Sequence, residues 1–211
     1  MPNHCTNLLI CTSGKTIGEL VKPYISERTD RQGVERFLDF NKIVPMPPCI
    51  EESSKFGDID YITSKRTPEE EAIEKQKQDE NKQTCVDETG FSGWYEWCKA
   101  KWDTKWNSYS NLTLEDSSNE IEDLSSYCFQ TAWCPPTNVI RELAKITGET
   151  IEMYYYDEGH MFFGCTTFSK DSENDECYEA EEAADIDPES DIYKYCDLDY
   201  YFEMHEDDDE E

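Results

Sequence analysis

The chain is poor in basic residues and in histidine. Its 211 residues include 19 lysines and arginines against 49 acids, and three histidines. The resulting net charge of −30 repels nucleic-acid phosphates and anionic membrane surfaces, so we expect no direct binding to either. Basic proteins and divalent cations are the natural partners of such a charge, unless it only keeps the chain soluble.

Long apolar runs and a secretory leader are also missing. No run approaches the roughly 20 apolar residues that a membrane-spanning helix needs. The first residues lack a basic stretch followed by an apolar core, so we expect no signal peptide. We therefore expect a cytoplasmic protein whose thiols stay reduced.

The ten cysteines include no Cys-x-x-Cys pair, which excludes the common zinc modules and iron–sulfur spacings. We expect most of them to be small buried residues, and we expect no cofactor and no metal. A nucleophile pair made of Cys5 or Cys165 with His160 stays open as an alternative.

Catalytic motifs are absent as well. The sequence contains no His-Glu-x-x-His, no Gly-x-x-x-x-Gly-Lys and no Gly-x-Ser-x-Gly. Its many carboxylates lie in low-complexity runs, whereas catalytic metal ligands need a fixed geometry with supporting contacts. We predict no catalytic residues and a binding function, with a metal-dependent hydrolase as an alternative.

Hydrophobic patterning predicts an α+β chain. Strand patterns cover residues 7–12, 37–44, 127–133, 150–156 and 161–168. Helical patterns or helix-start residues cover 17–25, 68–82, 94–102 and 135–148. We expect Pro23 to shorten the first helix and the prolines at 45–48 to end the second strand.

This order of elements is that of a split βαβ sandwich, in which an antiparallel sheet carries helices on one face. We expect such a domain over residues 1–168, with a polar insertion at about 51–90. An acidic, aromatic-containing extension follows over residues 169–211.

Four segments have an uncommon content of tryptophan and proline: Met1–Asn7, Asp39–Pro47, Trp94–Asn107 and Thr131–Pro136. Together, and in this order, they resemble the YubB-like ferredoxin-like family of plasmid and bacteriophage proteins. The resemblance implies a ferredoxin-like fold and an origin on a mobile element, hence a place in the host cytoplasm. It supplies no catalytic residues.

Two positions depart from the family pattern. His4 stands where tryptophan is common, and Asp103 stands where glycine is common. If Asp103 replaces a glycine in a left-handed turn, the geometry of that loop differs from the family's.

The tryptophan-rich block supplies the first set of candidate binding residues. Its interpretation as a protein-binding surface rests on tryptophan as an interface anchor, and Lys99, Lys101 and Lys105 also permit base stacking with phosphate contacts. The competing interpretation is that the tryptophans pack a small core. The candidates are Trp94, Trp97, Trp102, Lys105, Trp106 and Asn107.

The acidic end supplies the second set. Residues 171–211 hold twenty acids and one lysine, so they carry −19 of the net charge. Aromatic residues interrupt the acids up to about Phe202, which indicates an added strand or a segment that folds on binding. His205–Glu211 alone has the pattern of a solvated run. The candidates are Asp191, Asp197, Asp199 and Glu203.

These observations lead to one hypothesis and two alternatives. The hypothesis is a phage or plasmid accessory protein whose acidic surface mimics DNA and antagonises a host protein with a basic surface, such as a nucleic-acid-binding or defence factor. The first alternative is an interaction module that uses the Trp94–Asn107 block while the acidic end only solubilises the chain. The second is an uncharacterised enzyme.

Overall fold

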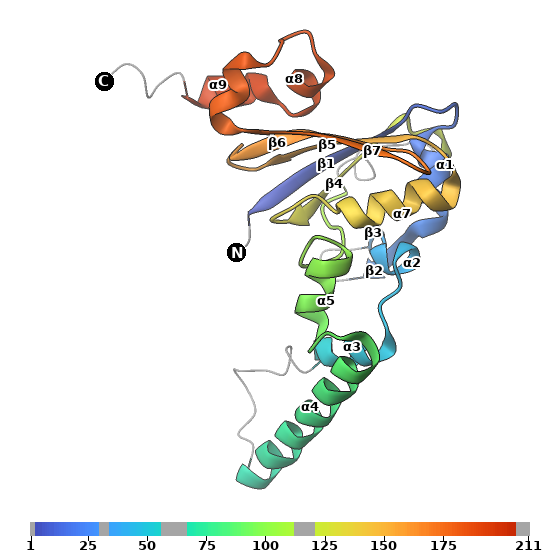
Figure 1. The fold of residues 1–211 in the computed structure, drawn as a ribbon, viewed down its shortest axis with the longest axis vertical. Helices are drawn as coiled ribbons and strands as arrows, with labels where there is room; N and C mark the ends of the chain where they lie inside the picture. The colour runs from blue at the N-terminus through green and yellow to red at the C-terminus, as the bar shows by residue number, and fades with distance from the viewer. Residues whose placement is uncertain (1–2, 30–33, 56–66, 112–120, 206–211) are drawn as a thin grey trace.

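The computed structural model describes residues 3–29, 34–55, 67–111 and 121–205. Five strands form one antiparallel sheet in the order β4-β1-β5-β6-β7 (Figure 1). Their bounds are β1 His4–Cys11, β4 Ser126–Ala132, β5 Ile151–Asp157, β6 Phe162–Phe168 and β7 Glu173–Glu179. The sheet and its helices confirm the predicted α+β class.

Strand β1 pairs antiparallel with both β4 and β5, so β4 and β5 run parallel to each other on its two sides. Helix α7, Thr137–Thr147, connects them. This is the predicted split βαβ unit. Gly148 ends α7 at a φ of 74°, a left-handed conformation that glycine adopts without a steric penalty.

One face of the sheet holds the main core. Ile151, Met153 and Tyr155 alternate along β5 toward this face, where they pack with Phe129 of β4. The apolar stripe of α7 covers the same core, together with α1, Ile17–Val21. The 3-10 helix η1, Lys22–Tyr24, follows α1 directly, so Pro23 shortens the predicted helix as expected.

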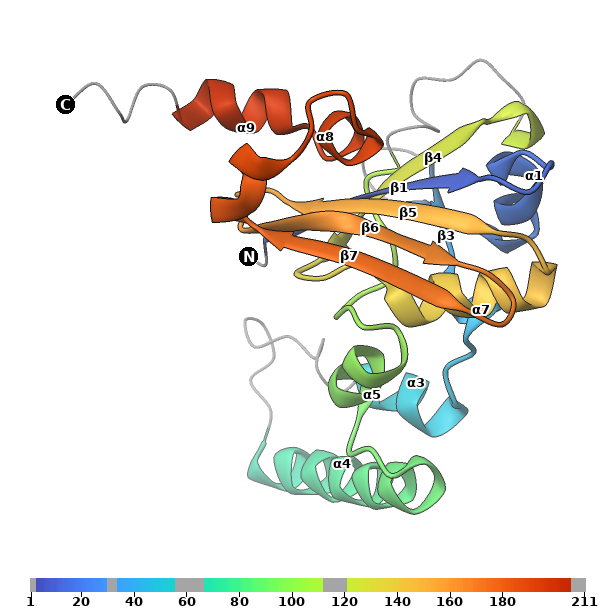
Figure 2. The ribbon, with the colours of Figure 1, turned by 45° about the horizontal axis from the view of Figure 1, so that its top comes forward.

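Helices also cover the opposite face of the sheet (Figures 1 and 2). We name residues 180–205 the C-terminal layer. It comprises the 3-10 helix η3, Ala180–Asp185, with α8, Asp191–Tyr195, and α9, Leu198–His205, and the segments that connect them. Cys196 and Leu198 of this layer are buried against Phe163 and Tyr154 of the sheet. Helices were expected on one face of the sheet only, and the structure has them on both faces.

The acidic extension thus joins the fold in two ways. Its first part adds the edge strand β7 over residues 173–179, which was not predicted. Its aromatic stretch forms the helices of the C-terminal layer. An added strand was one of the two expectations for the aromatic stretch, and for that stretch it is wrong. Most of the predicted solvated run, His205–Glu211, lies outside the described residues.

The predicted strand over 37–44 is wrong in its second half. Strand β3, Val34–Leu38, pairs with β2, Ile25–Thr29, in a separate hairpin, and residues 40–43 form the short helix α2, Phe40–Ile43. The Asp39 carboxylate starts this helix, because it accepts a hydrogen bond of 3.0 Å from the Asn41 amide. The sequence pattern also missed β2.

The polar insertion contains two helices that lie away from the sheet (Figure 1). They are α3, Pro48–Lys55, and α4, Pro68–Thr89, which is longer than the predicted 68–82. Thr67 and Glu70 form a capping box at the start of α4. Cys85 of α4 is fully buried and donates to the Cys49 carbonyl of α3. The remainder of the fold comprises α5, Trp94–Lys101, and the 3-10 helix η2, Ile121–Asp123.

Leu198→Ala tests whether the C-terminal layer is part of the cooperative fold. Leu198 is fully buried against the sheet, so its truncation leaves a cavity and should lower the free energy of unfolding by about 2–5 kcal/mol. Denaturant unfolding followed by circular dichroism measures this. The control is Ile146→Ala on α7, where the side chain is 52% exposed and the change should stay within about 0.5 kcal/mol. Equal values for the two variants would show that the layer does not dock as described.

Candidate functional site

The tryptophan-rich block separates into a buried part and a surface part. Trp97 and Trp102 are 3% and 4% exposed and pack edge-to-face with ring centroids 5.4 Å apart. The Trp102 indole donates to the Val44 carbonyl at 3.0 Å. For these two residues the core-packing interpretation is the one that the structure supports.

Asn107 also has a structural role. Its side-chain oxygen accepts from the Phe40 amide at 2.9 Å, and its side-chain nitrogen donates to the Asp39 carboxylate at 2.8 Å. Asn107 therefore fixes the start of α2 from a distant part of the chain. Trp94 is half-buried, and its amide donates to the Ser53 hydroxyl at 2.8 Å. Its side chain lines a cleft of about 380 Å³ between α4 and α5, together with Tyr95 and Lys82.

The surface part of the block gathers around Lys105. The Lys105 Nζ lies 4.5 Å from the ring centroid of Trp106, 5.0 Å from that of Trp133 and 5.9 Å from that of Tyr95. Tyr95 and Trp106 are 40% and 39% exposed, and Trp133 is half-buried. We name Tyr95, Trp106 and Trp133 the aromatic cage. Lys99 adds a second ammonium group 5.5 Å from the Tyr95 ring.

The backbone at Trp133 is unusual. Its φ is 73°, in the left-handed region that costs a residue with a Cβ roughly 1–2 kcal/mol. Hydrogen bonds on both sides hold this conformation: the Trp133 amide donates to the Asn3 carbonyl at 3.0 Å, and the Thr104 hydroxyl bonds both the amide and the carbonyl of Ala132. A bulky residue in such a conformation is a feature of ligand-contacting positions.

Within the part of the chain that the structure describes, the lysines of this region form no ion pair, although acids outnumber bases 49 to 19 in the chain. The ion pairs among the described residues involve Lys15, Lys22, Arg28, Lys55, Arg141 and Lys145, and one distant pair involves His4. Lys99, Lys101 and Lys105 are instead placed over aromatic rings. Their ammonium donors therefore remain available.

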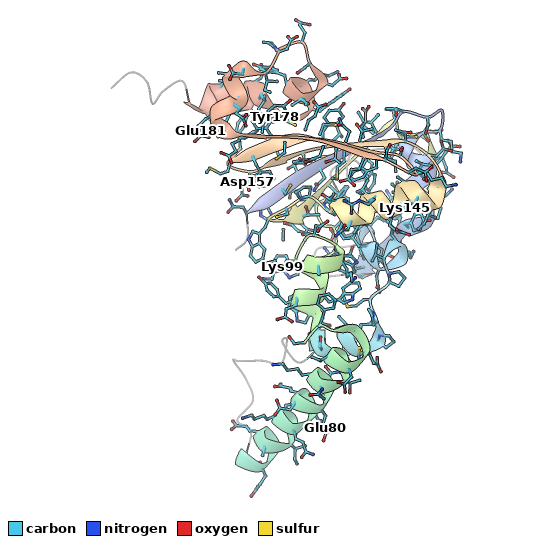
Figure 3. The ribbon with its side chains drawn as sticks, in the orientation of Figure 1. Glu80, Lys99, Lys145, Asp157, Tyr178 and Glu181 are labelled. Atoms are coloured by element: carbon cyan, nitrogen blue, oxygen red, sulfur yellow. The ribbon has the colours of Figure 1, made fainter. Side chains whose placement is uncertain are left out.

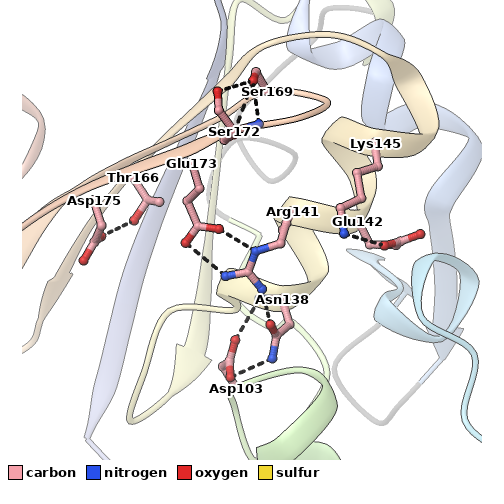
Figure 4. A network of polar contacts seen from close by, with 10 residues as sticks. All are labelled: Asp103, Asn138, Arg141, Glu142, Lys145, Thr166, Ser169, Ser172, Glu173 and Asp175. Atoms are coloured by element: carbon pink, nitrogen blue, oxygen red, sulfur yellow. Dashed lines mark hydrogen bonds and ion pairs between the residues drawn. The ribbon is translucent and has the colours of Figure 1, made fainter.

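Asp103 connects this region to α7. Its φ is 63°, so Asp103 stands in a left-handed turn, which was the condition considered for this position in the sequence. Its carboxylate accepts from the Asn138 amide at 2.7 Å and from the Asn138 side chain at 2.9 Å (Figure 4). Burial raises the pKa of the Asp103 carboxyl, and the Asn138 amide opposes this effect. One helical turn on, Arg141 pairs with Glu173 of β7 at 2.5 and 3.0 Å.

The second set of candidates lies in the C-terminal layer. Asp191, Asp197, Asp199 and Glu203 are all exposed. Figure 3 shows Glu181 of the same layer and Lys99 of α5 on opposite sides of the sheet. The structure therefore does not bring the two predicted sets together; it places them at separate surfaces.

The alternative thiol chemistry has no support at the predicted positions. Burial raises the pKa of Cys165 to about 12 and that of Cys5 well above its ordinary value, so neither is a thiolate at neutral pH. The Nε2 atom of His160 lies 3.1 Å from the Cys196 carbonyl, inside the C-terminal layer.

In the described part of the chain, no three or more His, Cys, Asp and Glu side chains gather in a way that would hold a metal ion. None of the helices in the same part is both long and apolar enough to cross a membrane.

Comparison with known proteins bears on the fold. Residues 101–197, somewhat under half of the chain, match the family model described as the ferredoxin-like domain in Api92-like protein. The fold is ferredoxin-like. The match contains β4, α7, β5, β6, β7 and α8, while strand β1, which lies between β4 and β5, comes from outside it.

A solved structure, the protein api92 from Yersinia pseudotuberculosis, is similar with a TM-score of 0.41 and 8% identity over 83% of this chain and 98% of that one. No curated protein has a matching sequence.

Sequence reasoning missed Tyr95 and Trp133 as members of the surface around Lys105, and it missed the buried Thr104 that holds the backbone beside Trp133. Tyr95 lies beside the tryptophans in the predicted helix, and Trp133 lies in the Thr131–Pro136 segment. The signal available was that both segments belong to the family resemblance. Their proximity in space depends on how β4 and α5 pack, which the sequence pattern does not specify.

The two parts of the tryptophan-rich block should respond differently to truncation. Trp97→Ala removes a buried ring and should lower the free energy of unfolding by about 3–5 kcal/mol. Trp106→Ala removes an exposed ring that contacts Lys105, so the loss should stay below about 1 kcal/mol. Denaturant unfolding of both variants measures the difference. A large loss in Trp106→Ala would place that residue in the core and not at the surface.

Substitution of Asp103 separates its hydrogen bonds from its backbone conformation. Asp103→Ala should lower the free energy of unfolding by about 1–2 kcal/mol, because the amide at the start of α7 loses its acceptor. Asp103→Gly loses the same bonds but should be roughly 1 kcal/mol more stable than the alanine variant, since glycine accepts a positive φ. Thermal and denaturant unfolding compare the two. Equal stabilities would mean that the turn relaxes once the carboxylate is removed.

Proposed function

We propose that this chain acts by binding a protein, and that its C-terminal layer meets the basic surface of a nucleic-acid-binding or defence protein in the way that DNA would. The observation that carries the proposal is a set of nine acids on this layer, every one of them exposed. They are Glu181, Glu182, Asp185, Asp187, Glu189, Asp191, Asp197, Asp199 and Glu203.

These carboxylates are free to meet a partner. The layer contains one base, Lys194, and within the described residues none of the nine acids forms an ion pair. Two of them accept backbone amides: Glu182 bonds the Glu179 amide, and Asp187 bonds the Glu189 amide. A basic partner would therefore meet carboxylates that no lysine or arginine of the described residues already pairs with.

The layer is also a folded support and not a loose acidic run. Ala183, Cys196 and Leu198 are buried against the sheet. The Cys196 thiol donates to the carbonyls of Tyr155 and Gly164, each at 3.5 Å, and so lies directly on the backbone of β5 and β6. Carboxylates on a docked layer lose less conformational entropy on binding than carboxylates of a disordered segment.

Two further observations support this proposal. The net charge of −30 would steer a basic partner to the chain and make association fast and salt-dependent. The resemblance of four segments to the YubB-like family favours an origin on a plasmid or a phage, where antagonism of a host factor is a coherent role. The partner is then a cytoplasmic protein of the host.

A competition experiment tests the proposal. Purified basic DNA-binding proteins are loaded with fluorescent DNA, and the chain is titrated in while fluorescence anisotropy reports DNA release. At least one such protein should release its DNA at low salt and retain it at high salt. Neutralisation of Asp191, Asp197, Asp199 and Glu203 to their amides should weaken this competition by about tenfold or more, since close charge pairs contribute at least about 1.5 kcal/mol.

The matched control neutralises four exposed acids of α4: Glu69, Glu71, Asp79 and Asp87. It changes the net charge by the same amount at a distant helix, so it should leave the competition close to that of the unmodified chain. If the two sets weaken competition equally, the effect is one of net charge alone and the proposed surface is wrong. If no basic protein loses its DNA, the mimicry proposal fails.

A further inference from the structure

The aromatic cage already holds an ammonium group. The three distances from Lys105 to the ring centroids all fall within the roughly 6 Å at which a cation is attracted to the face of a ring. The planes of Tyr95 and Trp133 stand at 88° to each other, with centroids 6.5 Å apart, and thus form two walls of a corner. The Trp106 ring lies at the shortest of the three distances from the cation, 4.5 Å.

We infer that Tyr95, Trp106 and Trp133 bind a quaternary ammonium group, and that Lys105 occupies their cage until such a ligand displaces it. This inference is independent of the proposed function, because it concerns a different surface, on the other side of the sheet from the C-terminal layer (Figure 3). The ligand class is a permethylated amine, either on a small molecule or on a trimethylated lysine side chain.

Lys105 is suited to leave the cage. Its contacts within the described residues are the three rings, without an ion pair or a hydrogen bond to hold the ammonium in place. A lysine ammonium is compact and strongly hydrated, and it sits on a flexible stem, so its return to water is favourable. A quaternary ammonium group has no N–H to hydrate and gains more from ring faces. The exchange therefore favours the external cation.

The cage is held in place before any ligand arrives. Trp133 keeps its left-handed φ of 73° because the Asn3 carbonyl and the Thr104 hydroxyl bond the backbone around it. Tyr95 is fixed by helix α5, and its ring stays 40% exposed. Rings that are both anchored and accessible bind a cation with little loss of conformational entropy.

The net charge of the chain favours a positively charged ligand over a negatively charged one. A net charge of −30 concentrates cations around the molecule and repels anions. The lysines near the cage would suit phosphate groups, but the field of the whole chain opposes a nucleic acid. A cationic ligand is favoured by the rings and by the net charge together.

Titration with tetramethylammonium chloride tests the site. In two-dimensional NMR spectra, the indole N–H signals of Trp106 and Trp133 should shift and saturate, while sodium chloride at equal ionic strength should leave them in place. Lys105→Ala empties the cage of its internal competitor, so this variant should bind tetramethylammonium roughly two- to fivefold more tightly. In that variant, Trp106→Leu should remove the saturable shift of the Trp133 indole.

Lys101→Ala is the matched control. It removes the same charge from the same segment, but Lys101 lies over the Phe91 ring and outside the cage, so affinity should stay at the value of the unmodified chain. Equal tightening in both lysine variants would show that only net charge matters and would overturn the inference. A folded Lys105→Ala variant whose indole signals do not saturate would overturn it as well.

Two further ligands then separate the possible sources of the cation. Choline represents a small molecule, and a short peptide with one trimethyllysine represents a modified protein. Tighter binding of the peptide than of its unmethylated form and of choline assigns the cage to a protein partner, and the reverse order assigns it to a small molecule. If neither ligand displaces tetramethylammonium, the proposed ligand class is wrong.

Discussion

Burial of both faces of the sheet is the constraint on which the rest of the molecule depends. Successive side chains of β5 point to opposite faces, and each series buries apolar or aromatic residues: Ile151 and Met153 enter the main core, while Tyr154 is buried on the other side. A sheet of this kind cannot leave either face in water without a large loss of hydrophobic free energy. Helices α1 and α7 cover one face, and the acidic C-terminal layer has to cover the other.

This constraint turns a highly charged segment into structure. The layer buries few side chains, chiefly Ala183, Cys196 and Leu198, and keeps its acids outside. The backbone of β7 also passes so close to β6 that position 164 has no room for a side chain. A Cβ at Gly164 would lie 2.2 Å from the Glu176 carbonyl of β7. Glycine at this position lets the acidic edge strand pair with β6. Thus a few small or apolar residues fix the position of many carboxylates.

Much of the fold follows from local sequence. Helix α7 has a clear apolar stripe and a glycine end signal, and β5 and β6 alternate around a short turn, so the sequence pattern was enough to predict these three elements.

The helix over residues 40–43 was not predicted, because Phe40 and Ile43 also suit a strand. This helix depends on Asp39 and on Asn107, which lies 67 residues away from Phe40. β7 was not predictable either, since its acids have little strand propensity and its pairing comes from the backbone of β6.

The candidate sites were predictable to a different degree. The exposed acids follow from composition, because carboxylates in such number cannot be buried. The spacing of the tryptophans does not by itself show which of them are buried and which lie at the surface. Trp97 and Trp106 look alike in sequence, yet one packs against Trp102 and the other against Lys105. The deciding partner is Trp133, brought to Lys105 by the packing of β4, so the cage exists only in the folded chain.

The distribution of charge across the sheet has a consequence for recognition. Carboxylates on the C-terminal layer lie within water and salt, where interactions beyond roughly 8 Å are screened at physiological ionic strength. The acids of that layer therefore act most strongly on a partner that touches it, and only the weaker field of the whole chain reaches the lysines and rings near α5, on the other side of the sheet (Figure 3). The two surfaces can have different partners, and the intervening sheet with its two buried faces keeps their chemistry separate.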